Sequence, residues 1–249
     1  MCPRSAFADG VVSVCTRQRM DAARGRSAAE LAAAATLSHY QTNAAQFWEG
    51  TRRHDVRQNR EALLRAAGVG GSPDGAPSSA ARVLDILDLG CGPGRDVAWF
   101  ASKGHSVTAL DGCSAFCGMC ADKGAAEVVC ADLHEVDLGV KRFDAVFANA
   151  SLFHVQKTEL PRVLAGVHRA IRPGGAFFAS NPRAMGEEDV EQRGGDAAYG
   201  DGRYGHYMTA ASWRRVCERT GFVLKEEYYR PPGVPREQQP WHATAWTRP

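Results

Sequence analysis

The chain has 249 residues, the size of one large domain or of one domain with a tail, and 44% are hydrophobic, which is enough for a core. Its 30 basic and 28 acidic side chains leave a formal net charge of +2, so bulk charge predicts no nucleic-acid or membrane partner. No apolar run approaches the roughly 18 residues that cross a bilayer, and the N-terminus lacks a signal-peptide core. These features predict a cytoplasmic protein.

The first third of the chain changes composition twice. Residues 1–36 are rich in alanine and arginine and predict a largely disordered tail that becomes helical near residue 28. Residues 38–67 predict one or two helices. The Gly-, Ser- and Pro-rich segment 68–81 predicts a flexible linker within a domain that spans residues 37–249.

Strand-like and helix-like segments alternate after this linker. The predicted strands are 81–90, 105–112, 126–133, 142–152, 175–182, 222–230 and 241–248. The predicted helices are 95–104, 114–123, 158–175 and 209–221. Alternation predicts parallel βαβ units in an open, doubly wound sheet. The last two strands lack room for a crossover helix, so the final pair is predicted to be antiparallel.

The strongest local motif is ILDLGCGPGRD at residues 86–96. A buried strand carries Asp88, and Gly90, Gly92 and Gly94 then turn the chain into a helix. Glycines allow positive φ and let a ligand approach the backbone closely. The spacing is GxGxG, which differs from the GxGxxG of dinucleotide folds and favours an adenosyl amino acid.

Polar residues at the ends of later strands fit the same ligand. Asp111 follows the second strand, where a carboxylate can accept both ribose hydroxyls. Asp132 and Leu133 follow the third strand, where a side chain and an amide can contact adenine. Asn149 ends the fourth strand, beside the expected reactive centre.

This arrangement resembles the class I S-adenosylmethionine-dependent methyltransferases over about residues 38–249. The resemblance implies a Rossmann-like, seven-stranded, mostly parallel sheet with an antiparallel last strand, and S-adenosylmethionine as the cofactor. The alternatives are another nucleotide-binding Rossmann protein, or a related fold that binds no ligand.

Eight cysteines in a chain without an export signal are expected to be thiols. Cys113, Cys117 and Cys120 have the CxxxCxxC spacing that can hold an iron–sulfur cluster. The upstream GCGPG loop and a helix start next to Asp111 instead indicate ordinary helix residues, and no metal site is expected.

Six stretches together resemble one particular family. They are FWEGTRRHDVRQN (47–59), LDLGCGPGRD (87–96), FANASLFHV (147–155), SNPRA (180–184), GRYGHY (202–207) and YYRPPGVPREQQPW (228–241). They are similar to the C-terminal methyltransferase domain of ovothiol-synthesising sulfoxide synthases. The resemblance implies N-methylation of the imidazole of 5-thiohistidine to give ovothiol A. The iron-dependent synthase domain is missing from this chain, so a separate sulfoxide synthase is expected to act first.

The residues that would suit such a substrate lie on loops predicted at the active rim. Arginines can bind the carboxylate, asparagines can orient the amine or ring, and aromatic side chains can form walls around it. The predicted substrate-binding residues are Phe47, Arg52, Phe153, Asn181, Arg183, Arg203, Tyr204, Tyr207, Tyr229 and Arg230. An isolated tyrosine or histidine at such a position is more often structural.

Asn149 and His154 are the candidate catalytic residues, with His154 as the general base. Tyr40 is predicted to cover the adenosyl group as part of an N-terminal lid, and the alternative is an amphipathic helix packed on the sheet. The stiff segment 231–240 is predicted to border the active site, or to be a simple hairpin. Other functional alternatives are a methyltransferase for another small molecule, such as a selenohistidine, a macromolecule methyltransferase, and a non-catalytic module that binds S-adenosylmethionine.

Overall fold

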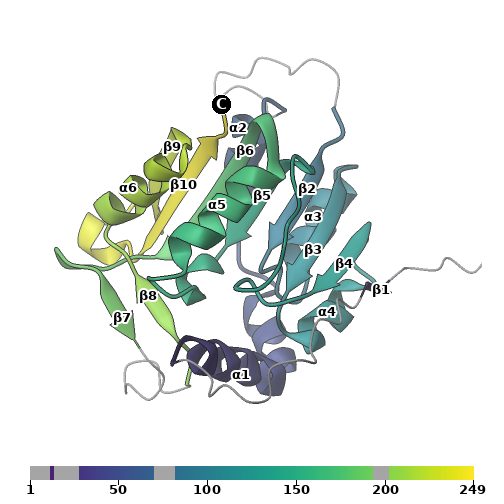
Figure 1. Ribbon diagram of the computed structural model, residues 1–249, viewed down its shortest axis with the longest axis horizontal. Coiled ribbons are helices and arrows are strands. Elements are labelled where there is room, and N and C mark those ends of the chain that lie inside the picture. Colours follow the sequence, from purple (N-terminus) through teal and green to yellow (C-terminus); the bar gives the residue numbers. More distant parts are fainter. Residues whose placement is uncertain (1–11, 14–27, 70–81, 193–201) are drawn as a thin grey trace, which may run out of the picture.

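The computed structural model describes residues 12–13, 28–69, 82–192 and 202–249. These residues form three layers, with a central sheet between two layers of helices (Figure 1). The helices are α1 (Ala28–Thr51), α2 (Arg57–Ala66), α3 (Arg95–Ser102), α4 (Ser114–Cys120), α5 (Leu160–Ala170) and α6 (Ala210–Thr220), with 3₁₀ turns η1 (Leu152–His154) and η2 (Arg236–Gln238). The strands are β1 (Val12–Ser13), β2 (Asp85–Leu89), β3 (Ser106–Asp111), β4 (Glu127–Cys130), β5 (Phe143–Asn149), β6 (Ile171–Pro182), β7 (Val190–Gln192), β8 (Gly205–Tyr207), β9 (Val223–Arg230) and β10 (Trp241–Thr247).

The central sheet has the order β1-β4-β3-β2-β5-β6-β10-β9. The two-residue strand β1 adds in parallel to β4 at one edge. The other seven strands form the predicted seven-stranded sheet, and the last strand, β10, is antiparallel to both of its neighbours. The predicted Rossmann-like methyltransferase fold is therefore confirmed.

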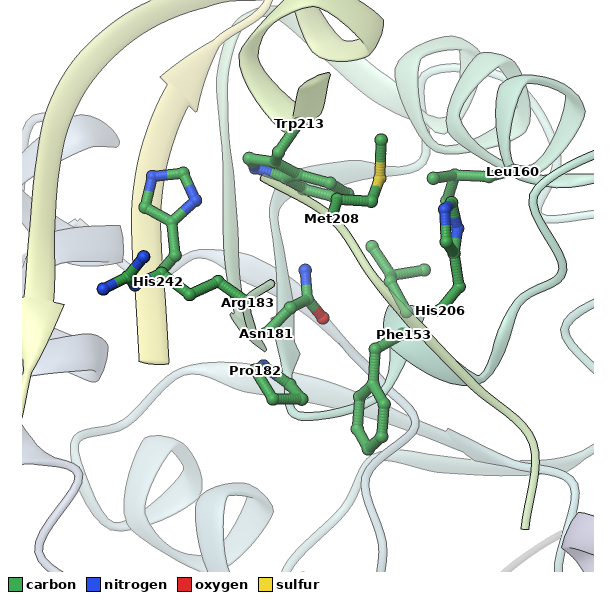
Figure 2. A pocket seen from close by; sticks show the side chains of 10 residues that line it. Phe153, Leu160, Asn181, Pro182, Arg183, His206, Met208, Trp213 and His242 are labelled. Atoms are coloured by element: carbon green, nitrogen blue, oxygen red, sulfur yellow. The ribbon is translucent and has the colours of Figure 1, made fainter. Parts of the chain in front are cut away.

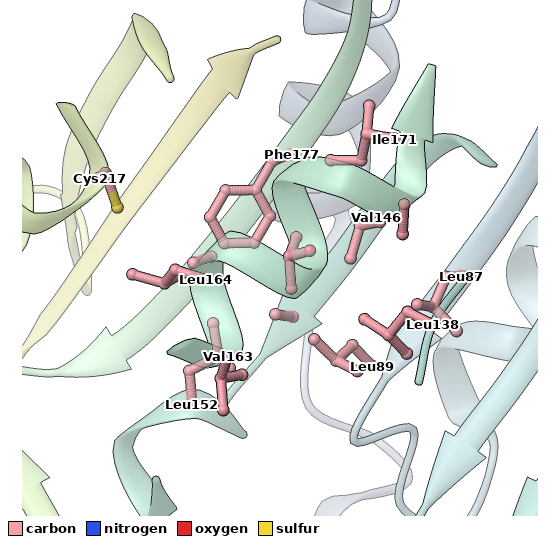
Figure 3. Packing of buried hydrophobic residues seen from close by; sticks show 14 of the residues in the cluster. Leu87, Leu89, Leu138, Val146, Leu152, Val163, Leu164, Ile171, Phe177 and Cys217 are labelled. Atoms are coloured by element: carbon pink, nitrogen blue, oxygen red, sulfur yellow. The ribbon is translucent and has the colours of Figure 1, made fainter. Parts of the chain in front are cut away.

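Side chains along the strands alternate between two cores because successive residues point to opposite faces. Leu87 and Phe177 pack on the face covered by α5 and α6 (Figure 3). Ile86 and Phe178 pack on the other face, with residues of α2 and α3. Both faces are buried, which is why these strands read as nearly continuous apolar runs.

Helix ends follow local chemistry at α6. Thr209 caps its N-terminus, with the hydroxyl accepting from the Ser212 amide at 3.1 Å. Gly221 ends it in the left-handed conformation at φ 102°. The boundaries predicted at 209 and 221 agree with this helix.

Two parts of the fold differ from the sequence prediction. Helix α5 ends at Ala170, and β6 begins at once, because Ile171 is already extended and the following Pro173 disfavours helix at Arg172. The segment 202–207 was predicted as loop, yet its last three residues form β8, which pairs antiparallel with β7. Three-residue strands carry too little periodicity to be recognised without their partner.

The predicted boundaries of the tail and the linker remain predictions. Helix α1 starts at Ala28 and runs across residue 36 without interruption. Thr36 is buried, and its hydroxyl accepts a hydrogen bond from the Tyr204 amide at 2.9 Å. Most of the predicted linker, residues 70–81, lies outside the described residues. Among the described helices, none combines the length and the apolar character needed to cross a membrane.

The carboxyl ends of the parallel strands all face α1, which lies across that edge of the sheet (Figure 1). In open α/β sheets this edge is where ligands bind. The segment 231–240 joins the carboxyl end of β9 to the start of β10, and Trp241 pairs with Pro182 at the carboxyl end of β6. The proline-rich segment therefore lies on the same edge.

Candidate active site

The three glycines of the turn between β2 and α3 have separate structural reasons. Gly90, Gly92 and Gly94 have φ of 75°, 54° and 87°. A methyl group on Gly90 would lie 2.3 Å from the Ser151 Cβ, and one on Gly94 would lie 2.9 Å from the Cys120 Sγ. Among the described residues, a methyl group on Gly92 would meet a single atom within 4 Å, in the Phe47 ring at 3.9 Å. Gly92 is therefore the glycine that leaves room for a ligand.

Two carboxyl groups flank this turn, at the ends of neighbouring strands. Asp88 is 2% exposed, and its Oδ2 has no hydrogen-bond partner within the described residues. Burial, with a smaller effect from Asp96, raises the pKa of Asp88 well above its usual value. Asp111 accepts hydrogen bonds from the Gly92 amide at 2.9 Å and the Cys113 amide at 2.8 Å. Burial raises the pKa of Asp111 to about 6 even though these amides lower it.

These features fit the predicted donor. A buried acid at Asp88, open space at Gly92 and a carboxylate at Asp111 suit the amino-acid and ribose ends of S-adenosylmethionine. The residue contacts themselves remain predictions.

The residues predicted to contact adenine already contact other parts of the protein. Asp132 Oδ1 accepts from the His134 amide at 2.9 Å and lies 2.7 Å from the His134 Nδ1. Burial raises the pKa of Asp132, but the bonds from His134 outweigh it and lower the pKa overall. Leu133 packs against the core cluster under α5. The predicted adenine contacts of Asp132 and Leu133 remain predictions.

Helix α1 closes over the donor turn. Leu37 lies against Gly112, since a methyl group there would meet its Cδ2 at 2.7 Å. Gln41 Oε1 accepts from the Ala115 amide at 3.1 Å and so caps the start of α4. Phe47 packs on Phe116 with ring centroids 5.3 Å apart. The helix is thus a packed element and also occupies the position predicted for a lid.

Tyr40 connects this helix to the candidate base. Its hydroxyl lies 2.8 Å from the His154 Nε2, and the His154 Nδ1 lies 2.6 Å from the Tyr204 carbonyl oxygen. A carbonyl can only accept, so Nδ1 carries the proton and Nε2 accepts from the Tyr40 hydroxyl. Arg203 Nη1 donates to the same hydroxyl at 3.1 Å. Any proton that His154 takes up on this nitrogen must pass through Tyr40, or Tyr40 must first move.

Aromatic residues beside His154 lie where aromatic walls around the substrate were predicted. The Phe153 ring lies 3.9 Å from the His154 ring between centroids and 6.0 Å from the Tyr207 ring. Tyr204 is buried and turns its hydroxyl away, donating to the Glu191 Oε1 at 2.6 Å. Phe153 and Tyr207 fit the predicted wall, whereas the Tyr204 hydroxyl supports the β7–β8 hairpin.

The predicted substrate arginines have different surroundings. Arg183 donates to the carbonyls of Gln239 at 2.9 Å and Arg236 at 2.7 Å, so its visible role is to hold the proline-rich segment. Arg52 pairs with Glu49 at 2.8 Å on a partly exposed surface. Substrate binding by Arg183 and Arg52 stays a prediction.

Tyr229 lies between two other rim side chains. The Arg236 guanidinium lies over its ring at 3.2 Å from the centroid, and the His242 ring stacks on it at 5.0 Å. Its packing rigidifies the rim, and its predicted contact with a ligand remains a prediction.

Arg230 leads to a polar cluster that sequence reasoning missed. Its Nη1 donates to the Asn59 Oδ1 at 3.0 Å, and its Nη2 donates to the Asp55 carbonyl at 2.6 Å. The Tyr228 hydroxyl donates to the same Oδ1 at 2.8 Å. Asn59 Nδ2 donates to the Asn149 Oδ1 at 2.8 Å. We call Asn59, Asn149, Tyr228 and Arg230 the asparagine cluster.

A sequence signal for Asn59 was available. It lies on the buried face of α2, four positions before the fully buried Leu63, and is itself 2% exposed. A polar residue at an apolar position of an amphipathic helix needs a buried partner. Nothing in the sequence says which partner that is.

A small pocket lies next to the carboxyl end of β6 (Figure 2). Within the described residues, Asn181 Oδ1 and His206 Nε2 are buried there without hydrogen-bond partners. Burial lowers the pKa of His206 and so favours its neutral form. Phe153 and Trp213 supply apolar walls. The predicted Asn181 thus lies in a polar recess beside the site.

Two of the three cysteines with cluster-like spacing are helix residues, as predicted, and the third is the N-cap of the same helix. Cys113 precedes α4, and Cys117 and Cys120 lie within it. Cys120 Sγ is 3.5 Å from Cys91 Sγ in the glycine turn. The hydrogen bond with Cys120, together with burial, raises the pKa of Cys91, so this thiol packs as a neutral group.

The sheet order, the antiparallel last strand and the glycine turn define a class I, Rossmann-like methyltransferase fold. Residues 87–179 match the family model described as a methyltransferase domain. The malonyl-[acyl-carrier protein] O-methyltransferase of Pseudescherichia vulneris is 34% identical over 96 residues, 38% of each chain. An uncharacterized methyltransferase of Synechocystis is 30% identical over 93 residues, 37% of this chain and 44% of that one. The matches thus span less than half the length of these curated relatives.

Solved structures share the fold over a larger part of the chain. The 1,6-didemethyltoxoflavin-N1-methyltransferase of Burkholderia thailandensis, with bound 1,6-didemethyltoxoflavin and S-adenosylhomocysteine, has a TM-score of 0.64 at 21% identity. The match covers 91% of this chain and 92% of that one. The complex of DhpI with SAH has a TM-score of 0.59 at 20% identity and covers 88% and 98%. Together with the domain match, these findings support an S-adenosylmethionine-dependent methyltransferase.

Proposed function

We propose that this chain methylates an imidazole nitrogen of 5-thiohistidine with S-adenosylmethionine, giving ovothiol A. The main support is the asparagine cluster at the carboxyl edge of the sheet, where Asn59 links Arg230 to Asn149. Arg230 uses two of its five N–H groups on Asn59 and Asp55, so others remain for a carboxylate. The six stretches that resemble the ovothiol methyltransferase domain agree with this substrate.

The surroundings of the cluster suit a flat, polar ring. Phe153 and Tyr207 supply aromatic faces, and His154 with Tyr40 supplies a proton-accepting pair. The Burkholderia neighbour is named as an N1-methyltransferase and holds 1,6-didemethyltoxoflavin, so a related fold accepts a small molecule. A small-molecule substrate is therefore favoured over a macromolecule.

The chemistry needs alignment more than acid–base power. When bound, S-adenosylmethionine supplies a methyl group on a sulfonium, whose carbon–sulfur bond breaks with its electron pair as the nitrogen–carbon bond forms. Asp88, Asp111 and the Gly92 backbone would hold the donor, and Asn149 would face the transferred group. Helix α1 would exclude water from the reacting atoms.

His154 has a limited task in this scheme. Loss of the thiol proton already makes the ring more nucleophilic, and the Tyr40–His154 pair can accept that proton. His154→Ala should lower kcat most at low pH, where the thiol is least ionised. Full kcat across about pH 6 to 9 would contradict the role of His154 as base.

The substrate test uses the purified chain with S-adenosylmethionine and 5-thiohistidine, with histidine and cysteine as controls. A product heavier by one methyl group, with the methyl located on a ring nitrogen by NMR and with histidine inert, is the expected result. Methylation on sulfur would keep the donor site but refute the substrate orientation. Donor binding with no product would favour another small molecule, such as a selenohistidine, or a non-catalytic donor-binding module.

A further inference from the structure

Hydrogen bonds in the asparagine cluster fix the orientation of the Asn59 side-chain amide and, through it, that of Asn149. A guanidinium can only donate, so the atom of Asn59 that faces Arg230 Nη1 at 3.0 Å must be its oxygen. The Tyr228 hydroxyl, 2.8 Å from the same oxygen, is then its second donor. The amide nitrogen of Asn59 therefore has to face Asn149.

Asn149, at the end of β5, is oriented in the same way by Asn59. The Asn59 NH₂ group donates to Asn149 at 2.8 Å, so Asn149 must present its oxygen there. Its own NH₂ group points elsewhere, and none of residues 28–69, 82–192 and 202–249 accepts a hydrogen bond from it. Asn59 is 2% exposed, so water does not compete for its amide.

The turn after Asn149 is also held in place, by hydrogen bonds at Ala150 and Ser151. Ala150 has φ of 62°, a conformation that side chains other than glycine rarely adopt. Its amide donates to the Ser180 carbonyl at 2.8 Å, and the Ser151 hydroxyl donates to the Leu89 carbonyl at 2.6 Å. Asn149 is thus held between the glycine turn and β6, at the place where donor and acceptor substrates meet in this fold.

We propose that Asn59 is a positioning residue that forces Asn149 to offer a hydrogen-bond donor to the substrate, so that the site selects an acceptor atom at this point. This inference rests on the proposed function, in which that acceptor is the thiolate of thiohistidine. A hydrogen bond to the thiolate lowers its reactivity and turns a ring nitrogen toward the methyl group. It thereby explains how a site can methylate nitrogen although sulfur is the better nucleophile.

The test exchanges donor for acceptor with little change in shape. In Asn59→Asp, the carboxylate accepts from the Asn149 NH₂ group and remains paired with Arg230, so Asn149 turns its oxygen to the substrate. The ratio of N-methyl to S-methyl product from 5-thiohistidine should fall by about tenfold or more, as expected for loss of a hydrogen bond to a charged group. Asn149→Asp should have a similar effect, and the double variant should be far from additive.

Controls separate positioning from folding. Asn43→Asp makes the same chemical change in α1, where the side chain donates to the His39 carbonyl, and should keep the wild-type product ratio. Affinity for S-adenosylhomocysteine should be unchanged in the Asn59 variant. If Asn59→Asp does not fold, Asn59→Ala removes the NH₂ group that orients Asn149 and should lower the ratio several-fold.

The outcomes are distinct. A wild-type product ratio in Asn59→Asp, or in Asn59→Ala if that variant must replace it, overturns the inference. If the wild-type chain does not methylate thiohistidine at all, the proposed substrate is wrong, and the orientation is read from the side-chain NH₂ signals in NMR. The two NH₂ proton signals that disappear in Asn149→Asp belong to Asn149. If these signals shift in the Asn59 variant, the orientation of Asn149 by Asn59 is supported, and if they do not move, it is refuted.

Discussion

Donor binding should weaken in mildly acidic solution because of Asp111. Burial raises the pKa of this carboxyl to about 6, despite hydrogen bonds from the Cys113 and Gly92 amides. Ribose hydroxyls donate best to the charged carboxylate. Protonation as the pH falls through about 6 removes that acceptor, so affinity is fully present above about pH 7 and is lost below the pKa.

The size of the effect follows from the charged fraction. With a pKa of about 6, only about a tenth of Asp111 is ionised at about pH 5, so the apparent dissociation constant should rise about tenfold relative to about pH 7.5. This corresponds to about 1.4 kcal/mol. Burial raises the pKa of Asp88 well above its usual value, which favours its neutral form in acidic solution. The nearby thiols of Cys91, Cys113 and Cys117 also stay neutral, since a hydrogen bond to Cys91 and burial of the other two raise their pKa values.

Titration calorimetry with S-adenosylhomocysteine measures this directly. That ligand has no sulfonium and no group that ionises between about pH 5 and about pH 7.5. The matched variant is Asp111→Asn, which should bind more weakly at neutral pH but show no slope. A change smaller than about twofold in the wild-type chain, or an equal slope in the variant, would refute the assignment of Asp111 to the ribose.

Three further substitutions test the packing around the site. Gly90→Ala should abolish donor binding in calorimetry and cost about 2–3 kcal/mol in urea unfolding, because its methyl group would lie 2.3 Å from the Ser151 Cβ at φ 75°. Gly118→Ala in α4 should instead raise the free energy of unfolding by about 0.5–1 kcal/mol, because among the described residues its methyl group would meet no atom beyond the helix backbone within 4 Å. Arg60→Met should cost about 2 kcal/mol or more, since it breaks a nearly buried pair with Asp96 at 2.6 Å, and unchanged stability would contradict this.

The architecture could be predicted because its signals are local. The strand before the glycine turn, the alternation that follows and the missing crossover helix at the end each occupy short windows. The glycine turn predicted a ligand site, and positive φ at Gly90, Gly92 and Gly94 agrees with its local geometry. The β7–β8 hairpin was not predicted, because each strand has three residues and depends on pairing with the other.

The hydrogen-bond partners of polar and charged side chains could not be predicted from the sequence. The sequence placed Arg183 near the active rim, and the structure agrees with that position. It could not show that the guanidinium is engaged by the carbonyls of Gln239 and Arg236, more than 50 positions later. Similarly, His154 was recognised as a candidate base, but the hydroxyl of Tyr40 on its Nε2 lies 114 positions away. A side chain's chemistry is readable from sequence, while its hydrogen-bond partner depends on tertiary packing.

The proline-rich segment 231–240 shows how such partners build a site. Arg183 holds its far end through the Arg236 and Gln239 carbonyls. Arg230 at its near end is held by Asn59 of α2 and by the Asp55 carbonyl just before that helix. A floppy connector would let Arg230 swing, and the Asn59 oxygen would lose a donor that fixes its direction. Prolines reduce that freedom before any ligand binds. The stiffness of the segment therefore supports the orientation of a side chain more than 160 positions earlier, which is why no local motif could reveal it.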